Sequence, residues 1–116
     1  MLAGSALTAA AAVAGLGIAA SRRYTRLRIT GFSMVPELVP GDRVLVDRHA
    51  RIAVGDVVAL HDPREERRCI VKRVVGIESH GLRVEGDNSD ESTDSRHFGP
   101  VPGALVIGRV VRRYGH

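Results

Sequence analysis

Aromatic residues are scarce in this sequence of 116 residues, which has two Phe, two Tyr and no Trp. Its hydrophobic core must therefore come mainly from Val, Ile and Leu, and the β-branched residues among these favour strands. The formal net charge of +4 reflects an excess of arginine, but no aromatic side chains alternate with the arginines as stacking platforms for nucleic-acid bases. We accordingly expect no nucleic-acid partner.

Cysteine occurs once, at Cys69, so a disulfide bond within the chain is excluded. Apolar residues follow it, and we therefore expect a small buried core residue rather than a reactive thiol. No Cys or His residues have the paired spacing of a zinc site. Asp87, Asp90 and Asp94 offer oxygen ligands for calcium, but their spacing matches no known calcium loop. We predict no metal and no other cofactor.

One long apolar run stands at the N-terminus, because residues 2–20 carry no charge. About 20 apolar residues suffice to cross a bilayer, so we expect residues 1–21 to form an apolar helix that anchors a single-pass protein in the cell membrane. A cleavable signal and a soluble Ala-rich helix are the alternatives. The arginines of segment 22–28 suit anionic lipid head groups, and by the positive-inside rule they place the rest of the chain in the cytoplasm.

After the basic connector 22–28, residues 29–116 alternate short apolar runs with Gly, Pro and Asp. This pattern predicts a mainly β fold, a small partly open β-barrel preceded by one N-terminal membrane helix. We expect segment 64–68 to be an exposed hairpin or loop. Segment 86–102 is too polar for regular structure, and a loop of that length is usually functional or disordered. The predicted strands are 27–30, 43–47, 56–61, 69–77, 82–85 and 104–112.

Ser33 is the first candidate for chemistry. It follows a predicted strand, and Pro36 stops regular pairing three residues later. Gly31 permits unusual backbone angles, and backbone N–H groups near Gly31 and Ser33 could converge on an oxyanion. A turn serine more commonly bonds its own backbone, so this segment alone does not establish a nucleophile.

Lys72 is the only lysine among the 17 basic residues. Strand alternation places it on one face with Ile70 and Val74, and places Arg73 on the other face. Burial lowers the pKa of a lysine, whereas arginine keeps its proton. Lys72 is therefore a candidate general base and Arg73 a candidate ion-pair partner. The alternative for Lys72 is a surface lysine at a strand edge.

Segment 86–96 is dense in hydroxyl and carboxylate groups. A neutral lysine amine needs a hydrogen-bond partner that aims it at the nucleophile, and Ser92 could supply one. Asp94 and Arg96 could hold the loop as an ion pair. The alternative is a solvated acidic loop. The five histidines are scattered, and nothing in the sequence indicates a Ser-His-Asp triad.

Taken together and in this order, segments 31–38, 72–76 and 86–96 resemble the nucleophile, general-base and last conserved boxes of the type I signal peptidases. These are membrane-bound serine endopeptidases with a Ser/Lys dyad, and the resemblance covers about residues 31–114. It implies cleavage after small residues in a precursor protein with an N-terminal leader. The implied roles are nucleophile for Ser33, general base for Lys72, oxyanion hole for the Gly31 and Ser33 amides, base orientation for Ser92, structural ion pair for Asp94 and Arg96, and substrate binding for Met34 and Pro36.

Two alternatives remain open within this interpretation. Only residues 77–82 separate the general-base box from the last box, where larger members carry an extra β-domain. The short length and segment 93–102 also resemble the maturation proteases of nickel-containing superoxide dismutase, which trim a single substrate. A catalytically idle membrane adaptor is the alternative of another class. A secretory peptidase would need its catalytic domain outside the cytoplasm, so the side of the membrane is left open.

Overall fold

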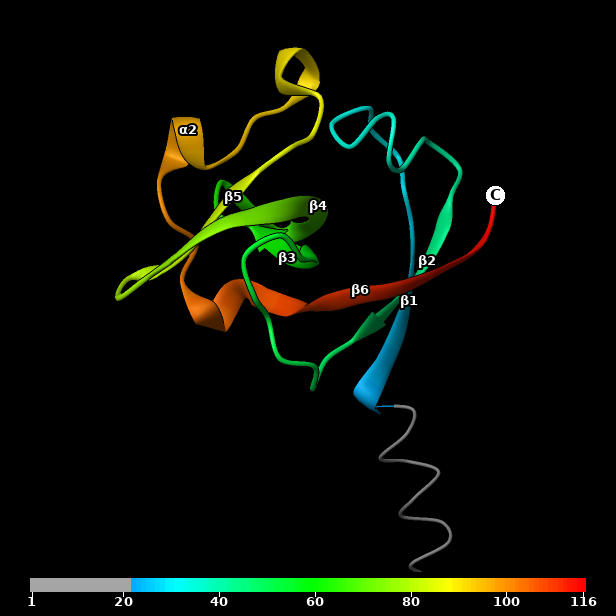
Figure 1. Cartoon of the computed structure of the whole chain (residues 1–116), viewed down its shortest axis with the longest axis horizontal. Coiled ribbons are helices and arrows are strands. Elements are labelled where there is room, and N and C mark those ends of the chain that lie inside the picture. The colour runs from blue at the N-terminus through cyan, green and yellow to red at the C-terminus, as the bar shows by residue number, and fades with distance from the viewer. Residues whose placement is uncertain (1–21) are drawn as a thin grey trace, which may run out of the picture.

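A single antiparallel sheet of six strands organises the protein, in the order β1-β2-β6-β3-β4-β5 (Figure 1). The computed structural model describes residues 22–116. The last strand, β6, lies between β2 and β3 and joins the N-terminal pair of strands to the three-stranded β3-β4-β5 meander. The strands are β1 (Tyr24–Arg28), β2 (Arg43–Asp47), β3 (Val57–Asp62), β4 (Glu65–Glu78), β5 (Gly81–Glu85) and β6 (Val106–Gly115).

Apart from Arg22 and Arg23, which are helical at the start of the described residues, helical structure within residues 22–116 consists of three short segments: η1 (Ser89–Glu91), α2 (Ser95–Phe98) and η2 (Gly103–Leu105). The expected mainly β class is confirmed. In the described part of the chain β1 and β5 are the two sheet edges and do not pair with each other, so the sheet is not closed. The expected partly open barrel therefore stays a prediction.

The core consists of two clusters on opposite faces of β3. Ala59 belongs to one cluster, whereas Val58 and Leu60 belong to the other, because successive residues of a strand point to opposite faces. All three side chains are fully buried. The curled sheet thus covers both faces of β3. The first cluster also contains Ile29, Met34, Leu38, Val44 and Val46, and the second contains Val74, Val84 and Val101.

The predicted strands correspond to the observed ones, with shifted bounds for all except β2. β1 was expected over 27–30 but lies at Tyr24–Arg28, inside the segment expected to be a connector, where it pairs with β2. Segment 64–68 was expected to be an exposed hairpin or loop, and it is exposed and lies in the β3-β4 hairpin, with Arg64 in the turn and the other residues in β4. Glu65 pairs with Asp62 at an irregularity of the ladder, and the charged residues after it remain in the strand, so their polarity does not end it.

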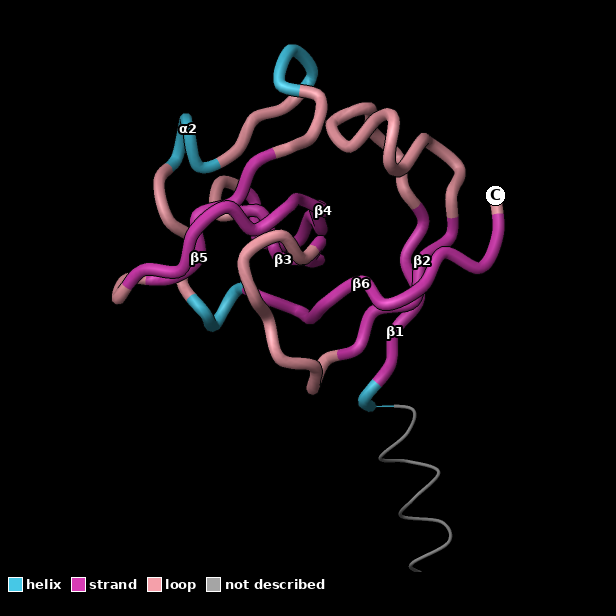
Figure 2. The backbone as a smooth tube through the Cα atoms, in the orientation of Figure 1, coloured by secondary structure: helices cyan, strands magenta, loops and turns pink. Residues whose placement is uncertain are grey.

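Segment 86–102 was predicted to lack regular structure, and that expectation is wrong in part. It contains η1 and α2. The Asp94 carboxylate accepts a hydrogen bond from the backbone N–H of Arg96 and caps α2 at its start. Figure 2 shows that this loop and the loop after β1 lie at the same side of the sheet. Both contribute to the site described below.

The predicted N-terminal helix over 1–21 lies outside the described residues. Within residues 22–116, none of the helices is long and apolar enough to span a bilayer.

Candidate active site

The turn that carries Ser33 is anchored in the core by the residue that follows it. Met34 is 1% exposed and packs in the first core cluster. Its carbonyl oxygen accepts a hydrogen bond from the Leu38 N–H at 2.9 Å, and Leu38 is also buried. Ser33 itself is half-buried. The buried Met34 therefore fixes the backbone on which the Ser33 hydroxyl stands.

Asn88, from the loop after β5, holds this turn from the other side. Its backbone N–H donates to the Ser33 carbonyl oxygen at 2.8 Å, and its side-chain amide donates to the Phe32 carbonyl oxygen at 3.0 Å. Gly86 makes the close approach possible, because a Cβ there would lie 2.6 Å from the Ser33 carbonyl oxygen and would overlap the Ser92 hydroxyl. The loop after β1 and the loop after β5 are thereby hydrogen-bonded to each other at Ser33.

Lys72 projects from β4 and is only 4% exposed. Its Nζ donates a hydrogen bond to the Ser92 hydroxyl oxygen at 2.9 Å. The pKa of Lys72 is lowered, chiefly because burial penalises the charged ammonium. Asp94 opposes this effect, while Arg64 lowers the pKa further. The site thus favours a neutral amine more than water does.

Ser92 connects Lys72 to a buried carboxylate. Its hydroxyl donates to Asp94 Oδ2 at 2.6 Å, so the oxygen that accepts from Lys72 has its proton directed away from the amine. Asp94 is fully buried and also accepts from Arg96 Nη2 at 2.6 Å and from the Gly86 N–H at 2.8 Å. Burial alone would raise the pKa of Asp94, but the hydrogen bonds, led by that from Arg96, outweigh it and lower the pKa far below its ordinary value.

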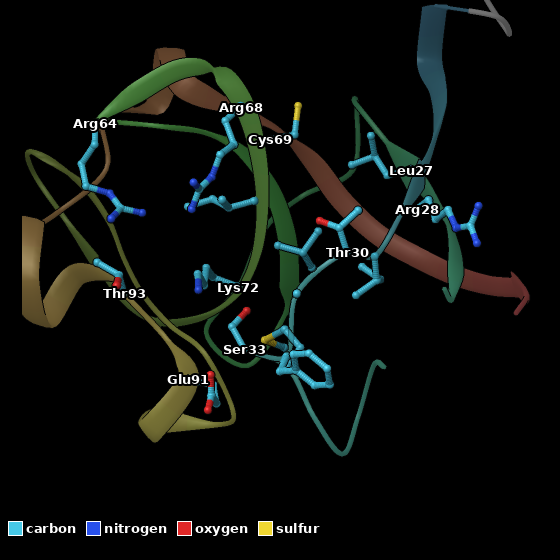
Figure 3. Close-up of a pocket in the computed structure, with 16 residues that line it drawn as sticks. Leu27, Arg28, Thr30, Ser33, Arg64, Arg68, Cys69, Lys72, Glu91 and Thr93 are labelled. Atoms are coloured by element: carbon cyan, nitrogen blue, oxygen red, sulfur yellow. The ribbon is translucent and has the colours of Figure 1, made fainter. Parts of the chain in front are cut away.

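Ser33 and Lys72 line one cavity of about 270 Å³ (Figure 3). In Figure 3 Ser33 and Lys72 lie next to each other at this cavity. One wall is the chain leaving β1, residues 27–34, and the opposite wall is the β4 segment 68–72. Arg64, Glu91 and Thr93 also line this cavity. A serine hydroxyl, a buried amine and an elongated space between two extended segments are the components that hydrolysis of a peptide bond needs.

Comparison with known proteins adds to this geometry. The family described as signal peptidase, peptidase S26, matches this chain over residues 2–85 and 77–114. The chain belongs to the signal peptidase family. This membership supports a serine peptidase and agrees with the resemblance noted in the sequence.

Several curated signal peptidase relatives come from mitochondria. The mitochondrial ATP-independent inner membrane protease subunit 1a of Arabidopsis thaliana is 35% identical over 73% of this chain and 67% of its own length. Mitochondrial inner membrane protease subunit 1 is 34% identical in Xenopus tropicalis, over 72% of this chain and 65% of the relative. The human protein of that name is 33% identical, over 70% and 63%. The chain thus spans about two thirds of the length of these relatives.

The residues expected to act in a signal peptidase are not all at the cavity. Ser33, Lys72, Gly31 and Met34 line it. Pro36 does not line it and is exposed in the turn beyond Met34. The three residues behind Lys72 form a connected hydrogen-bonded chain, with Ser92 first, then Asp94, then Arg96. Their functional roles remain predictions.

The prediction for Cys69 is wrong. It was expected to be a buried core residue, but its side chain is exposed and lines the cavity. The first five residues of β4, from Glu65 to Cys69, are all exposed. The buried part of the strand therefore begins one residue later than the apolar run in the sequence.

Sequence reasoning missed the double hydrogen bond from Asn88 and the arginines near Lys72. The sequence singled out Asn88 only as part of segment 86–96, where the run Gly86-Asp87-Asn88 is the one available signal. Arg73 has the ion pair expected of it, because its Nε and Nη2 donate to the Asp87 carboxylate at 2.9 and 2.8 Å. That pair fixes the start of the loop that carries Asn88.

Proposed function

We propose that this chain is a membrane-associated serine endopeptidase that removes an N-terminal leader from a precursor protein with a Ser33/Lys72 dyad. The observation that carries the proposal is the environment of the sole lysine. Lys72 is buried, has a lowered pKa and shares a cavity with Ser33. Membership of the signal peptidase family and relatives named as inner membrane proteases support the same conclusion.

The proposed reaction begins with neutral Lys72 as general base. Its Nζ takes the Ser33 hydroxyl proton while Ser33 Oγ attacks the scissile carbonyl carbon, which gives a tetrahedral oxyanion. Backbone N–H groups near Gly31 and Ser33 are the proposed donors to that oxygen. The Lys72 ammonium then protonates the leaving amine, and the C–N bond breaks. Water attacks the acyl-enzyme with Lys72 again as base, which releases the carboxylate product and restores the Ser33 hydroxyl.

Ser92 is proposed to orient the Lys72 amine toward the Ser33 hydroxyl. The Ser92 hydroxyl donates a hydrogen bond to Asp94 and therefore presents a lone pair to the amine. Arg96 and the Gly86 amide keep the Asp94 carboxylate ionised and oriented. This arrangement leaves the lone pair of a neutral Lys72 free for the Ser33 proton. Asp94 and Arg96 act in this scheme as structural groups.

The leader is proposed to bind as an extended chain between the two walls of the cavity. Extended peptides dock in this way beside sheet edges, with alternate side chains in pockets. The small volume and the buried Met34 near Ser33 suit a small side chain before the cut. Pro36 would contribute only by shaping the turn. We expect cleavage after small residues, Ala at the first and third positions before the cut being the test sequence.

The test uses membranes that contain the full chain and a peptide with Ala at those two positions. We expect Ser33→Ala and Lys72→Arg each to lower kcat/KM by at least about 1,000-fold. Lys72→Arg keeps a long side chain with hydrogen-bond donors but supplies no base, because arginine does not lose its proton. Ser79→Ala, at an exposed turn serine, is the matched control and should be active. Wild-type turnover that persists unchanged in Ser33→Ala or in Lys72→Arg would exclude the dyad, and no wild-type turnover would favour the adaptor.

A further inference from the structure

Two arginines at one end of the cavity are held by a single buried carboxylate. Asp62, at the end of β3, is 1% exposed. It accepts hydrogen bonds from Arg64 Nε at 3.0 Å and Arg64 Nη2 at 2.8 Å, and Arg68 Nε lies 3.5 Å from its Oδ2. Arg64 also stands over the Phe98 ring, 5.7 Å from its centroid. One negative charge thus fixes two positive charges, which leaves an excess of one.

Arg68 is the arginine of this pair that is free to bind something else. In the described part of the chain it makes no ion pair apart from that with Asp62, and its guanidinium donates no hydrogen bond. Its side chain is 62% exposed, against 44% for Arg64. Two terminal amino groups of Arg68 are therefore available at the cavity wall in a preset orientation.

The cavity as a whole favours an anionic group on this side. Its charged or basic lining residues are Arg28, Arg64, Arg68 and Lys72 against one carboxylate, Glu91. In Figure 3 the Arg68 guanidinium lies on one side of Lys72 and Glu91 on the other, while Arg28 points away from the cavity. The positive charge is therefore concentrated at the end that Arg64 and Arg68 form.

The spacing along β4 indicates where a substrate would meet Arg68. Arg68, Ile70 and Lys72 share one face of the strand, and four residues of strand span about 13 Å. An extended substrate has the same rise per residue. A side chain about four residues from the scissile bond therefore reaches Arg68 when the bond itself lies at Ser33 and Lys72.

We propose that Arg68, positioned by Asp62 together with Arg64, selects substrates with a carboxylate side chain about four residues from the scissile bond. This inference rests on the proposed peptidase function and names a specificity determinant of that site. A guanidinium binds a carboxylate with two parallel charge-assisted hydrogen bonds. Because Arg68 remains partly exposed, we expect a moderate preference.

The experiment uses peptides that differ only by Glu, Gln or Lys at one position, placed in turn at each of the five positions on either side of the cut. With full-chain membranes we expect kcat/KM to be about three- to tenfold higher for Glu than for Gln at one position about four residues from the cut, and lowest for Lys. Added salt at 0.5 M should reduce this preference, because screening weakens a partly exposed ion pair.

Arg68→Gln should bring Glu and Gln peptides to equal kcat/KM at that position. Arg67→Gln is the matched control, because Arg67 is the neighbouring residue on β4, is 93% exposed and does not line the cavity. It should keep the wild-type preference. Equal rates for Glu and Gln at every position in the wild type, or a Glu preference that survives in Arg68→Gln, would overturn the inference.

A binding measurement separates this inference from the proposed reaction. Dissociation constants of the same peptides with the Ser33→Ala protein report recognition without turnover. A Glu preference in binding that Arg68→Gln removes would support the inference even if no peptide is cleaved. Ser33-dependent cleavage without any Glu preference in rate or binding would instead leave the reaction standing and refute the role of Arg68.

Discussion

The surroundings of Lys72 shift its pKa in opposite directions. Burial lowers its pKa most, Asp94 and Asp62 raise it, and Arg64 and Arg68 lower it again. The net direction is downward, and the hydrogen bond to Ser92 keeps the amine at the cavity rather than at the strand edge. The pKa of Lys72 thus depends both on charged groups of the β3-β4 hairpin and on Asp94 in the loop after β5.

The pH dependence of cleavage follows from this balance. A general base must be neutral, and the neutral fraction of Lys72 rises with pH until it is complete above the pKa. Because that pKa is lowered from its ordinary value of 10.5, the rise should occur at lower pH than for a free lysine. We expect kcat/KM to reach half its maximum below pH 10.5, measured over a pH series with the Ala peptide. A half-maximum at the ordinary lysine value would contradict a desolvated base.

At the scale of elements, the site is made where two loops and one strand meet. The loop after β1 presents Ser33, the strand β4 presents Lys72, and the loop after β5 supplies Ser92 and Asn88. The two bonds from Asn88 to the Phe32 and Ser33 carbonyl oxygens connect the loops directly. The position of Ser33 is therefore set by a segment more than fifty residues away.

The variant Asn88→Ala should show whether Asn88 matters more for the position of Ser33 than for the stability of the fold. It removes the side-chain bond to the Phe32 carbonyl oxygen and leaves the backbone bond to Ser33 in place. A single such bond contributes about 1 kcal/mol to stability, whereas a misplaced nucleophile lowers the rate far more. We expect kcat/KM to fall about tenfold or more with a small change in Tm. Ser89→Ala, at the next residue, is the control, and an equal loss of activity there would argue against the specific role of Asn88.

Local pattern predicted the strands well where apolar residues alternate, as in β2, whose bounds Arg43–Asp47 were as expected. It failed at the start of β4, because residues 65–68 are charged and exposed and still belong to the strand, although only Glu65 of these has a partner on β3. The sequence pointed to Ser33 and Lys72 through residue type and order. It could not reveal the shared carboxylate of Asp62, since a contact between Asp62 and Arg68 exists only once the hairpin has formed.

For the whole molecule, β6 is the strand that joins two halves of the sheet. It pairs with β2 on one side and with β3 on the other, so the half that carries Ser33 and the half that carries Lys72 are aligned through it. Gly108 lies where β6 passes the end of β2, and a Cβ there would overlap the Asp47 carbonyl oxygen and lie 2.9 Å from Arg48 Cα. The three nearest atoms all belong to the backbone of Asp47 and Arg48, so no flexible side chain can move away.

Gly108→Ala should therefore weaken the junction of the two halves. Forcing extra atoms into a packed contact costs about 1–3 kcal/mol, and we expect that loss in the free energy of unfolding measured with urea. Gly103→Ala is the matched control, because nothing lies within 4 Å of a Cβ at Gly103. A loss of stability no greater for Gly108→Ala than for Gly103→Ala would show that β6 tolerates displacement there.

The exposed sulfur of Cys69 has a practical use. As the only thiol of the chain and part of the cavity wall, it can carry one fluorophore at a known place without any engineered cysteine. Occupancy of the cavity by a peptide should then change the emission of that dye, or slow its attachment. The protein labelled at Cys69 would thus report peptide binding directly, and a set of unlabelled leader peptides could be ranked by their affinity for the cavity.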